Sequence, residues 1–285
     1  MAVNISIELL KKRGLFYSLR SRPLKTIFFR IKRFVFEKIR VYRRKKIILK
    51  LEPYIVSPPT DIILGKNFEF KNLEIVSEQY ASQNYAFIEN FFSQDTYNKI
   101  CDSFPHEVFF NYPRNGSKFY SWSEEFRWIR DDNNTTYDEK NAETFFHLYP
   151  TFKKLFNFLN SEDMSEKVKI ITNSHEAQLY SIALTRAKEG SFLSPHTDTI
   201  STVKKPGEKI MMNFIYFLIG GGSSPVNSGG TSLYHDNEFN KLIFTPPTIK
   251  NSALLYDSIE QFHHGFDVMA PGSFRWSIVF QYKLL

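Results

Sequence analysis

The stretch "AQLYSIALTRAKEGSFLSPHTD" (residues 177–198) predicts the fold of this chain. It contains two short runs rich in β-branched and aromatic residues, "AQLYSIALT" (177–185) and "FLSPH" (192–196), and "KEG" between them is typical of a turn. It ends in His196 and Asp198, two residues apart. We therefore expect two successive strands, the second of which carries two polar side chains on one face at its end.

Six further runs of the same kind follow at close intervals, separated by turn sequences such as "KKPGEK", "GGGSSPVNSGG", "TIKN" and "APGS". The runs cover residues 210–219, 231–235, 241–247, 252–257, 263–269 and 274–285. Eight short strands with such turns predict a jelly roll of two facing antiparallel sheets. The fold class is therefore mainly β with flanking helices (α+β), with a core over residues 177–285.

The flanking helices are expected before this core. "YAFIENFFSQDTYNKICDSFP" (85–105) is typical of a strand followed by a helix, with Ser93 as N-cap and Pro105 as a stop. Residues 142–160 predict a helix interrupted or begun at Pro150. "LEPYIVSPPTDIILG" (51–65) carries three prolines and indicates a linker. We expect an arm over 1–50, a linker or extended segment over 51–83 and one domain over 84–285.

Charge divides the chain into two parts. Of its 285 residues, the first 50 include 16 Lys or Arg against Glu8 and Glu37, whereas the remainder includes 21 basic and 28 acidic residues. Apolar residues recur with the helical period from Leu24 to Tyr42, and basic residues fill the gaps. This pattern predicts a basic amphipathic helix that lies on an anionic membrane surface or packs on the protein's own body. No nucleic-acid-binding module follows it, so specific nucleic-acid binding is not expected.

The cellular compartment is inferred from the same sequence. The single Cys101 excludes an intramolecular disulfide framework, and no signal peptide is recognisable, which indicates a reducing, cytoplasmic compartment. No apolar run reaches the length of a membrane-spanning helix. With the basic arm, we expect a cytoplasmic protein that binds peripherally to the inner face of the membrane.

His196 and Asp198 need a third partner to form a metal site, and His235, His263 and His264 are the candidates. Strand alternation puts His264, Phe266 and Val268 on one face and His263, Gly265 and Asp267 on the other. The face with two large apolar residues is the better interior, so His264 is preferred and His263 is the alternative. Two His and one carboxylate form the facial triad of non-haem Fe(II) oxygenases, although zinc can take the same ligands.

Arg275 strengthens this interpretation because it begins the last predicted strand, directly after the "MAPGS" turn. A hairpin there would pair Val268 with Arg275 and His264 with Val279, so that Arg275 points inward about 13 Å along the strand from the metal ligand. A guanidinium binds the far carboxylate of a metal-chelated dicarboxylate with two hydrogen bonds. Ser277 faces the same way and can add another. Taken singly, a hydrogen-bonded loop pair and a structural salt bridge would also explain these residues.

The pattern "GSFLSPHTD … NFIYFL … GGTSLY … HHGF … GSFRWSI" resembles the Fe(II)- and 2-oxoglutarate-dependent oxygenase superfamily, in particular its prolyl-4-hydroxylase-like branch. The resemblance covers roughly residues 177–285, with a weaker match over 84–105, and implies a cupin-like double-stranded β-helix. By motif, His196, Asp198 and His264 match the iron ligands, Arg275 matches the residue that binds the distal carboxylate of 2-oxoglutarate, and Gly229–Gly230 matches a turn of the branch. The stretch from His264 to Arg275 is slightly longer than the commonest spacing, which keeps His263 as the alternative ligand.

The resemblance also implies an activity. Fe(II), 2-oxoglutarate and O2 are the expected cofactor and cosubstrates, with ascorbate as a further candidate. Oxidative decarboxylation of 2-oxoglutarate to succinate and CO2 would be coupled to hydroxylation of an unactivated C–H bond. The branch suggests peptidyl proline as substrate, whereas the basic arm favours a membrane- or lipid-linked anionic glycan, such as a lipid A inner-core sugar. A non-catalytic jelly-roll binding module is the alternative from another class.

Overall fold

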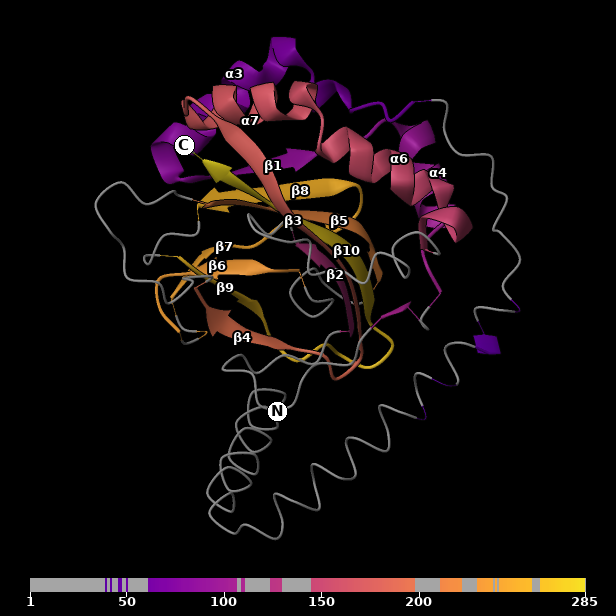
Figure 1. Ribbon diagram of the computed structural model, residues 1–285. Helices are drawn as coiled ribbons and strands as arrows, with labels where there is room; N and C mark the ends of the chain where they lie inside the picture. Colours follow the sequence, from indigo (N-terminus) through magenta and orange to yellow (C-terminus); the bar gives the residue numbers. More distant parts are fainter. Residues whose placement is uncertain are drawn as a thin grey trace, which may run out of the picture. The chain divides into compact units, whose positions relative to one another are not determined.

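The structure is a computed structural model of the chain (Figure 1). By its contacts the chain divides into two units, Met1–Glu52 and Pro53–Leu285. The predicted basic helix of residues 24–42 lies outside the described residues except for Ile39 and Tyr42, which are both helical. Among the described residues, no helix combines the length and the apolar character needed to cross a membrane. The described residues are 39, 42, 46, 47, 50, 61–106, 109–110, 124–129 (backbone alone), 145–197, 211–221, 230–237, 239, 241–257 and 262–284.

Two antiparallel sheets form the body of the second unit (Figure 1). The larger sheet has the order β1(Tyr85–Glu89), β8(Ser252–Asp257), β5(Met211–Gly221), β10(Phe274–Leu284), β3(Ala177–Lys188) and β2(Glu124–Ile129). The smaller sheet has the order β4(Leu193–His196), β9(His263–Phe266), β6(Ser232–Tyr234) and β7(Leu242–Phe244). Leu233 of the smaller sheet packs with Ile215, Phe217 and Leu254 of the larger one, so the core lies between the two sheets.

The order of the strands identifies a double-stranded β-helix. From β3 onward, the chain passes back and forth between the larger and the smaller sheet, and only β6 and β7 follow each other within one sheet. This alternation is the topology of a jelly roll, and it confirms the predicted fold class. All eight strands predicted after residue 176 are present, whereas β1 and β2 extend the larger sheet at its two edges.

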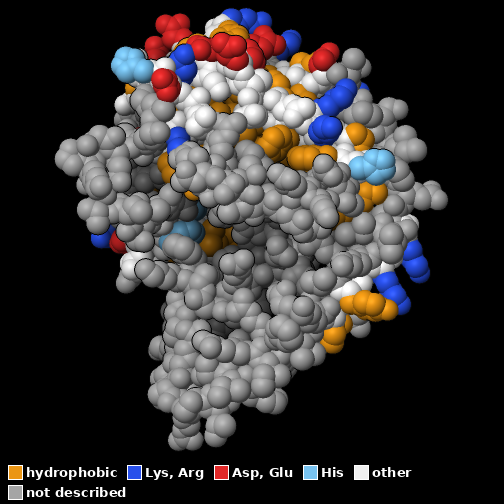
Figure 2. Space-filling model, in the orientation of Figure 1, with side chains coloured by type: hydrophobic (Ala, Val, Ile, Leu, Met, Phe, Trp, Pro, Cys, Tyr) orange, Lys and Arg blue, Asp and Glu red, His pale blue; other side chains and the backbone are white. Residues whose placement is uncertain are grey.

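Helices cover the outer face of the larger sheet (Figure 1). They are α3(Leu73–Gln83), α4(Gln94–Asp102), α6(Pro150–Leu159) and α7(Glu162–Thr172). The sheet presents Phe214 and Phe280 on this side, stacked with ring centroids 4.6 Å apart, and the Tyr282 hydroxyl donates a hydrogen bond to the Leu159 carbonyl. Figure 2 shows acidic side chains gathered over α3 and α7, on the side of these helices that faces solvent.

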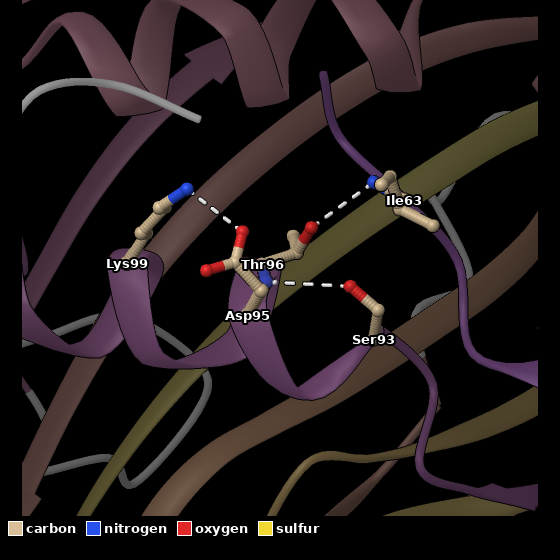
Figure 3. Close-up of polar contacts among 5 residues, drawn as sticks. All are labelled: Ile63, Ser93, Asp95, Thr96 and Lys99. Atoms are coloured by element: carbon tan, nitrogen blue, oxygen red, sulfur yellow. Dashed lines mark hydrogen bonds and ion pairs between the residues drawn. The ribbon is translucent and has the colours of Figure 1, made fainter. Parts of the chain in front are cut away.

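The start of α4 shows how local sequence fixes one of these helices (Figure 3). Ser93 Oγ accepts a hydrogen bond from Thr96 N–H at 3.3 Å, as the N-cap prediction requires. Thr96 Oγ1 accepts one from Ile63 N–H at 3.0 Å, and Lys99 pairs with Asp95 at 2.7 Å. The helix ends at Asp102, before Pro105, and the predicted strand and helix over 85–105 are confirmed.

A buried asparagine ties the turn before β8 to the segment between β1 and α4. Asn251 has φ 48°, a left-handed conformation that asparagine tolerates better than most residues. Its side chain accepts hydrogen bonds from Phe92 N–H at 3.1 Å and the Tyr216 hydroxyl at 3.0 Å, and donates one to the Phe92 carbonyl at 2.9 Å. These bonds hold the edge strand β1 and the helix layer in register with the jelly roll.

Two sequence predictions about elements are wrong. Residues 66–83, expected within a linker or extended segment, form the 3-10 turns η2(Lys66–Phe68) and η3(Phe70–Asn72) and the helix α3. This region is helical because tertiary contacts hold it: Phe68 is fully buried and α3 packs on α7 and β1. The expected hairpin of the last two strands is absent, since β9 and β10 lie in opposite sheets. Met269 instead pairs with the turn after β3: its N–H donates to the Ser191 carbonyl at 2.8 Å and its carbonyl accepts from Gly190 N–H at 2.9 Å.

Candidate metal and cosubstrate site

Two histidine rings from different strands lie against each other in the smaller sheet. His196 ends β4 and His264 is the second residue of β9, and the two are paired in the register of these strands. Their ring centroids are 4.3 Å apart with an interplanar angle of 48°. Pairing of β4 with β9 therefore brings together two imidazoles that are far apart in the sequence, close enough to bind the same metal ion.

Gly265 lets the two strands approach closely. A Cβ at this position would lie 2.5 Å from the Leu193 carbonyl oxygen and 2.8 Å from Pro195 N. Both contacts are with the backbone of β4, which cannot yield without moving the strand. Gly265 does not have a positive φ, so the backbone conformation does not demand glycine here. Glycine is required beside His264 because the two strands pack closely.

The His196 ring is held in one tautomer. Its Nδ1 lies 2.8 Å from the Ser194 carbonyl oxygen, which can only accept a hydrogen bond. Nδ1 therefore carries the hydrogen, and in the neutral ring the lone pair is on Nε2. A backbone carbonyl that fixes one ring nitrogen in this way is the usual support of a metal-binding imidazole.

The three histidines that are candidates for the third ligand differ in their burial and surroundings. His264 is 5% exposed, and the Tyr256 ring lies 5.1 Å from its ring. His263 is partly exposed on β9, and its pKa is lowered by burial. His235 is exposed beyond β6. The structure therefore brings His264, the inward residue predicted by alternation, against His196.

The predicted carboxylate, Asp198, lies two residues after His196 and outside the described residues. Within the described part of the chain, no group of three His, Cys, Asp or Glu residues could hold a metal. The two histidines are thus the part of the predicted triad that the structure places, and Asp198 as third ligand stays a prediction.

Arg275 is a buried cation between the sheets. It is 3% exposed, its Nη1 donates a hydrogen bond to Thr231 Oγ1 at 2.9 Å, and its guanidinium lies over the Phe266 ring at 4.3 Å. Burial lowers the pKa of Arg275 to about 9, so the side chain stays cationic at neutral pH. Because it donates to a hydroxyl and stacks on an aromatic ring, the guanidinium has a fixed orientation.

The position of Arg275 relative to the histidines differs from the predicted one. Phe266, which the guanidinium covers, is two residues beyond His264 on β9, a step of about 7 Å along a strand. The expected separation of about 13 Å assumed a β9–β10 hairpin. In the structure β9 and β10 face each other across the core, so the arginine reaches the histidine strand across the interior.

No protein-family model and no curated protein matches the sequence. A solved oxidoreductase of the 2OG-Fe(II) oxygenase family from Burkholderia pseudomallei is similar in structure, with a TM-score of 0.51 and 12% identity over 74% of this chain and 90% of that chain. The non-heme alpha ketoglutarate dependent epimerase SnoN is also similar in structure, with a TM-score of 0.53 and 10% identity over 75% of this chain and 82% of that chain. For a prolyl hydroxylase from Trichoplax adhaerens the TM-score is 0.47, with 15% identity over 77% of this chain and 90% of that chain.

The chain has the fold of the Fe(II)- and 2-oxoglutarate-dependent oxygenases. Within this oxygenase fold, the residues that the structure places have the chemistry of the expected ligands. Two imidazoles that lie against each other suit a divalent first-row metal, and a buried guanidinium suits a carboxylate. The histidine pair and Arg275 are thus the residues that could hold a metal and a dicarboxylate.

Ser277, the remaining predicted residue, lies on the inward face of β10 two residues after Arg275. It is fully buried, and its hydroxyl is 2.6 Å from Thr185 Oγ1 of β3. Ser277 and Thr185 thus form a neutral polar pair beside the arginine. The pair extends the polar part of the interior beyond the guanidinium itself.

Sequence reasoning missed several residues of this site. Thr231 and Phe266 orient Arg275, Gly265 sets the distance between the histidine strands, and Tyr256 packs on His264. Alternation along residues 263–269 was enough to place Phe266 inward. The contacts of Thr231 and Tyr256 had no signal in the sequence, because both cross between strands that are distant in the chain.

Proposed function

We propose that this protein is an Fe(II)- and 2-oxoglutarate-dependent oxygenase that hydroxylates an unactivated C–H bond. The observation that carries the proposal is Arg275, a buried cation whose guanidinium lies over Phe266, two residues beyond His264 on β9, inside an oxygenase fold. Burying a charge is costly, and a bound carboxylate would offset that cost. A dicarboxylate whose other end chelates a metal at the histidines would supply that carboxylate.

Each residue has a role in this proposal. His196 through Nε2, His264 and Asp198 hold the metal, and the Ser194 carbonyl keeps the His196 ring in the binding tautomer. When bound, iron supplies the redox chemistry by which 2-oxoglutarate and O2 are consumed and a C–H bond is oxidised. Arg275 binds the distal carboxylate of 2-oxoglutarate while Thr231 holds its Nη1. Phe266 and Phe217 flank the guanidinium and exclude water from the carboxylate.

Hydroxylation is the reaction that the sequence motifs favour, although SnoN, a structure of this fold, is an epimerase. The proposal is tested with the purified full-length protein in air. Succinate formation from 2-oxoglutarate should require added Fe(II), even without a primary substrate, and should stop when a chelator removes the metal. A non-catalytic jelly-roll binding module would leave 2-oxoglutarate unchanged in the presence of iron.

The basic arm supports a membrane location for this activity. Its charge, 16 basic residues against two acidic ones in residues 1–50, would attract it to an anionic inner membrane surface. The full-length protein should then sediment with vesicles that contain anionic lipids at low salt and be released at high salt. A protein that ignores these vesicles at low salt would contradict the membrane location and leave the oxygenase proposal intact.

A further inference from the structure

A hydrogen-bonded row of neutral polar side chains crosses the inner face of the larger sheet. Ser181 of β3 is paired with Gln281 of β10, and Gln281 is paired with Asn213 of β5. Ser181 Oγ donates to Gln281 Oε1 at 2.6 Å, and Gln281 Nε2 donates to Asn213 Oδ1 at 2.8 Å. We call Ser181, Gln281 and Asn213 the amide row. No residue of the row is among the proposed ligands of the metal or of 2-oxoglutarate.

The row faces the core rather than the helices. Along β10, Gln281 shares a face with Arg275, Ser277 and Val279 because it follows them at steps of two residues. Val279 packs against the cluster that joins the two sheets. Asn213 shares its face in the same way with Ile215 and Phe217, two members of that cluster. The row therefore points toward the smaller sheet, which carries His196 and His264.

The row also lies at the level of the histidines. The next residue across the sheet is Tyr256 of β8, which is paired with Asn213. The Tyr256 ring is 5.1 Å from the His264 ring. Arg275 is six residues away from Gln281 along β10, about 20 Å. The amide row is thus close to the histidine pair and distant from Arg275 along β10.

The inner face of β10 is more exposed toward Gln281 than toward Arg275, although Ser181 and Asn213 beside Gln281 are buried. β10 is flanked by β3 and β5, so its inward side chains can meet solvent only from the space between the sheets. Arg275 and Ser277 are buried there, at 3% and 0% exposed. Val279 and Gln281 on the same face are partly exposed, and His196 is partly exposed as well. A substrate that enters between the sheets would therefore meet Gln281 beside the metal position.

The chemistry of the row indicates what it can bind. Side-chain amides and a hydroxyl offer both donors and acceptors and carry no charge. The backbone of β10 is paired with strands on both sides, so a peptide cannot add here as a strand. Carbohydrate hydroxyls, which both donate and accept, fit such a row better than an anionic group does.

We infer that Gln281, held in place by the buried Ser181 and Asn213, binds hydroxyl groups of a carbohydrate substrate beside the metal, an inference that rests on the proposed oxygenase function. Gln281 is the specificity-determining residue because it bonds to both other members and is the most accessible of the three. Its amide would orient the sugar ring, and thereby choose the C–H bond that lies nearest the reacting atoms.

Binding is measured by saturation-transfer NMR, with the full-length protein loaded with Ni(II) and 2-oxoglutarate to prevent turnover. The probes are methyl glycosides of glucose, galactose, mannose and N-acetylglucosamine, and a Pro-Pro-Gly repeat peptide. At least one glycoside should bind the wild-type protein. Gln281→Leu should weaken that binding about three- to tenfold, as loss of a hydrogen bond does, and Gln281→Asn should restore part of it. Gln178→Leu is the matched control, because Gln178 is exposed on the same sheet.

Three outcomes would overturn the inference. They are equal glycoside binding by the wild-type and Gln281→Leu proteins, binding of the peptide alone, and binding of no probe. If Gln281→Leu does not fold, as judged by thermal unfolding, Ser181→Ala replaces it, with an expected loss of about two- to threefold. Failure of the oxygenase proposal is separate, since it appears as absence of iron-dependent 2-oxoglutarate decarboxylation by the wild-type protein.

Discussion

The two ends of the space between the sheets differ in a way that matches two kinds of ligand. At one end, Arg275 and Ser277 are buried, and their polar atoms bond to Thr231 and Thr185. At the other end, Gln281 is partly exposed beside the histidine pair. The closed end suits a cosubstrate of fixed shape and charge, whose contacts can be built in advance. The open end suits a substrate that must enter and leave at each turnover.

The largest effect is expected at the histidine pair, which lies beside the open end. His196→Ala and His264→Ala each remove a proposed ligand, so iron content and iron-dependent 2-oxoglutarate decarboxylation should fall by more than about 100-fold, beyond the loss typical of outer-shell changes. Iron is measured by mass spectrometry after desalting. His263→Ala and His235→Ala are the controls and should keep most of the iron. Iron loss in His263→Ala with retention in His264→Ala would show that the metal uses the other face of β9.

A smaller effect, confined to the closed end, is expected for Arg275→Lys. Lysine keeps the charge but cannot bind a carboxylate with two parallel hydrogen bonds, so the KM for 2-oxoglutarate should rise about 10- to 100-fold while iron stays bound. Arg186→Lys is the matched control, because Arg186 lies over Phe110 on the neighbouring strand β3. An unchanged KM in Arg275→Lys would mean that another cation binds the cosubstrate.

The pH dependence of the KM for 2-oxoglutarate also tests the role of Arg275. Burial lowers the pKa of Arg275 to about 9, so the guanidinium loses its proton, and its attraction for a carboxylate, as the pH rises through that value. The KM for 2-oxoglutarate should be constant near neutral pH and rise about tenfold for each pH unit above 9. Arg275→Met should lack this inflection. A flat profile in the wild-type enzyme up to pH 10 would show that the guanidinium keeps its proton above pH 9.

Gly265→Ala tests whether close strand packing holds the histidine pair. The added methyl meets the backbone of β4, so iron affinity should fall about five- to tenfold and the free energy of unfolding by about 1–3 kcal/mol. Gly190→Ala is the control. It strains a turn with φ 73° but meets no atom within 4 Å, so it should lower stability without lowering iron affinity. Equal iron affinity in the two variants would count against a positioning role for Gly265.

The smallest effect is expected for Ser277→Ala. The change removes one neutral hydrogen bond at the closed end, so the KM for 2-oxoglutarate should rise about two- to threefold. Ser252→Ala is the control, since that buried serine of β8 donates to the Thr248 carbonyl at 2.9 Å. A larger rise in KM in the control would show that any buried serine of this sheet affects the site through packing.

Local patterns in the sequence determined the elements that depend on local physics. The eight strands after residue 176, the Ser93 cap and the helix that begins at Pro150 agree with the structure, because strand alternation, capping and the geometry of proline act over a few residues. Alternation also determined that His264 and Phe266 face the core. The helix α7 had usable signals as well, namely the N-cap Ser161 and two acidic residues in its first turn.

Only the tertiary structure decided how these elements meet. "APGS" is compatible with a hairpin and with a crossing to the other sheet; the structure has the crossing, with Met269 bonded to the turn after β3. The helix α3 is weakly amphipathic by itself and forms where α7 and β1 cover it. Asn213, Gln281 and Ser181 are ordinary polar residues in the sequence, far apart along the chain. They form a row because a sheet sets its register through non-local pairing, which the period of a single strand does not encode.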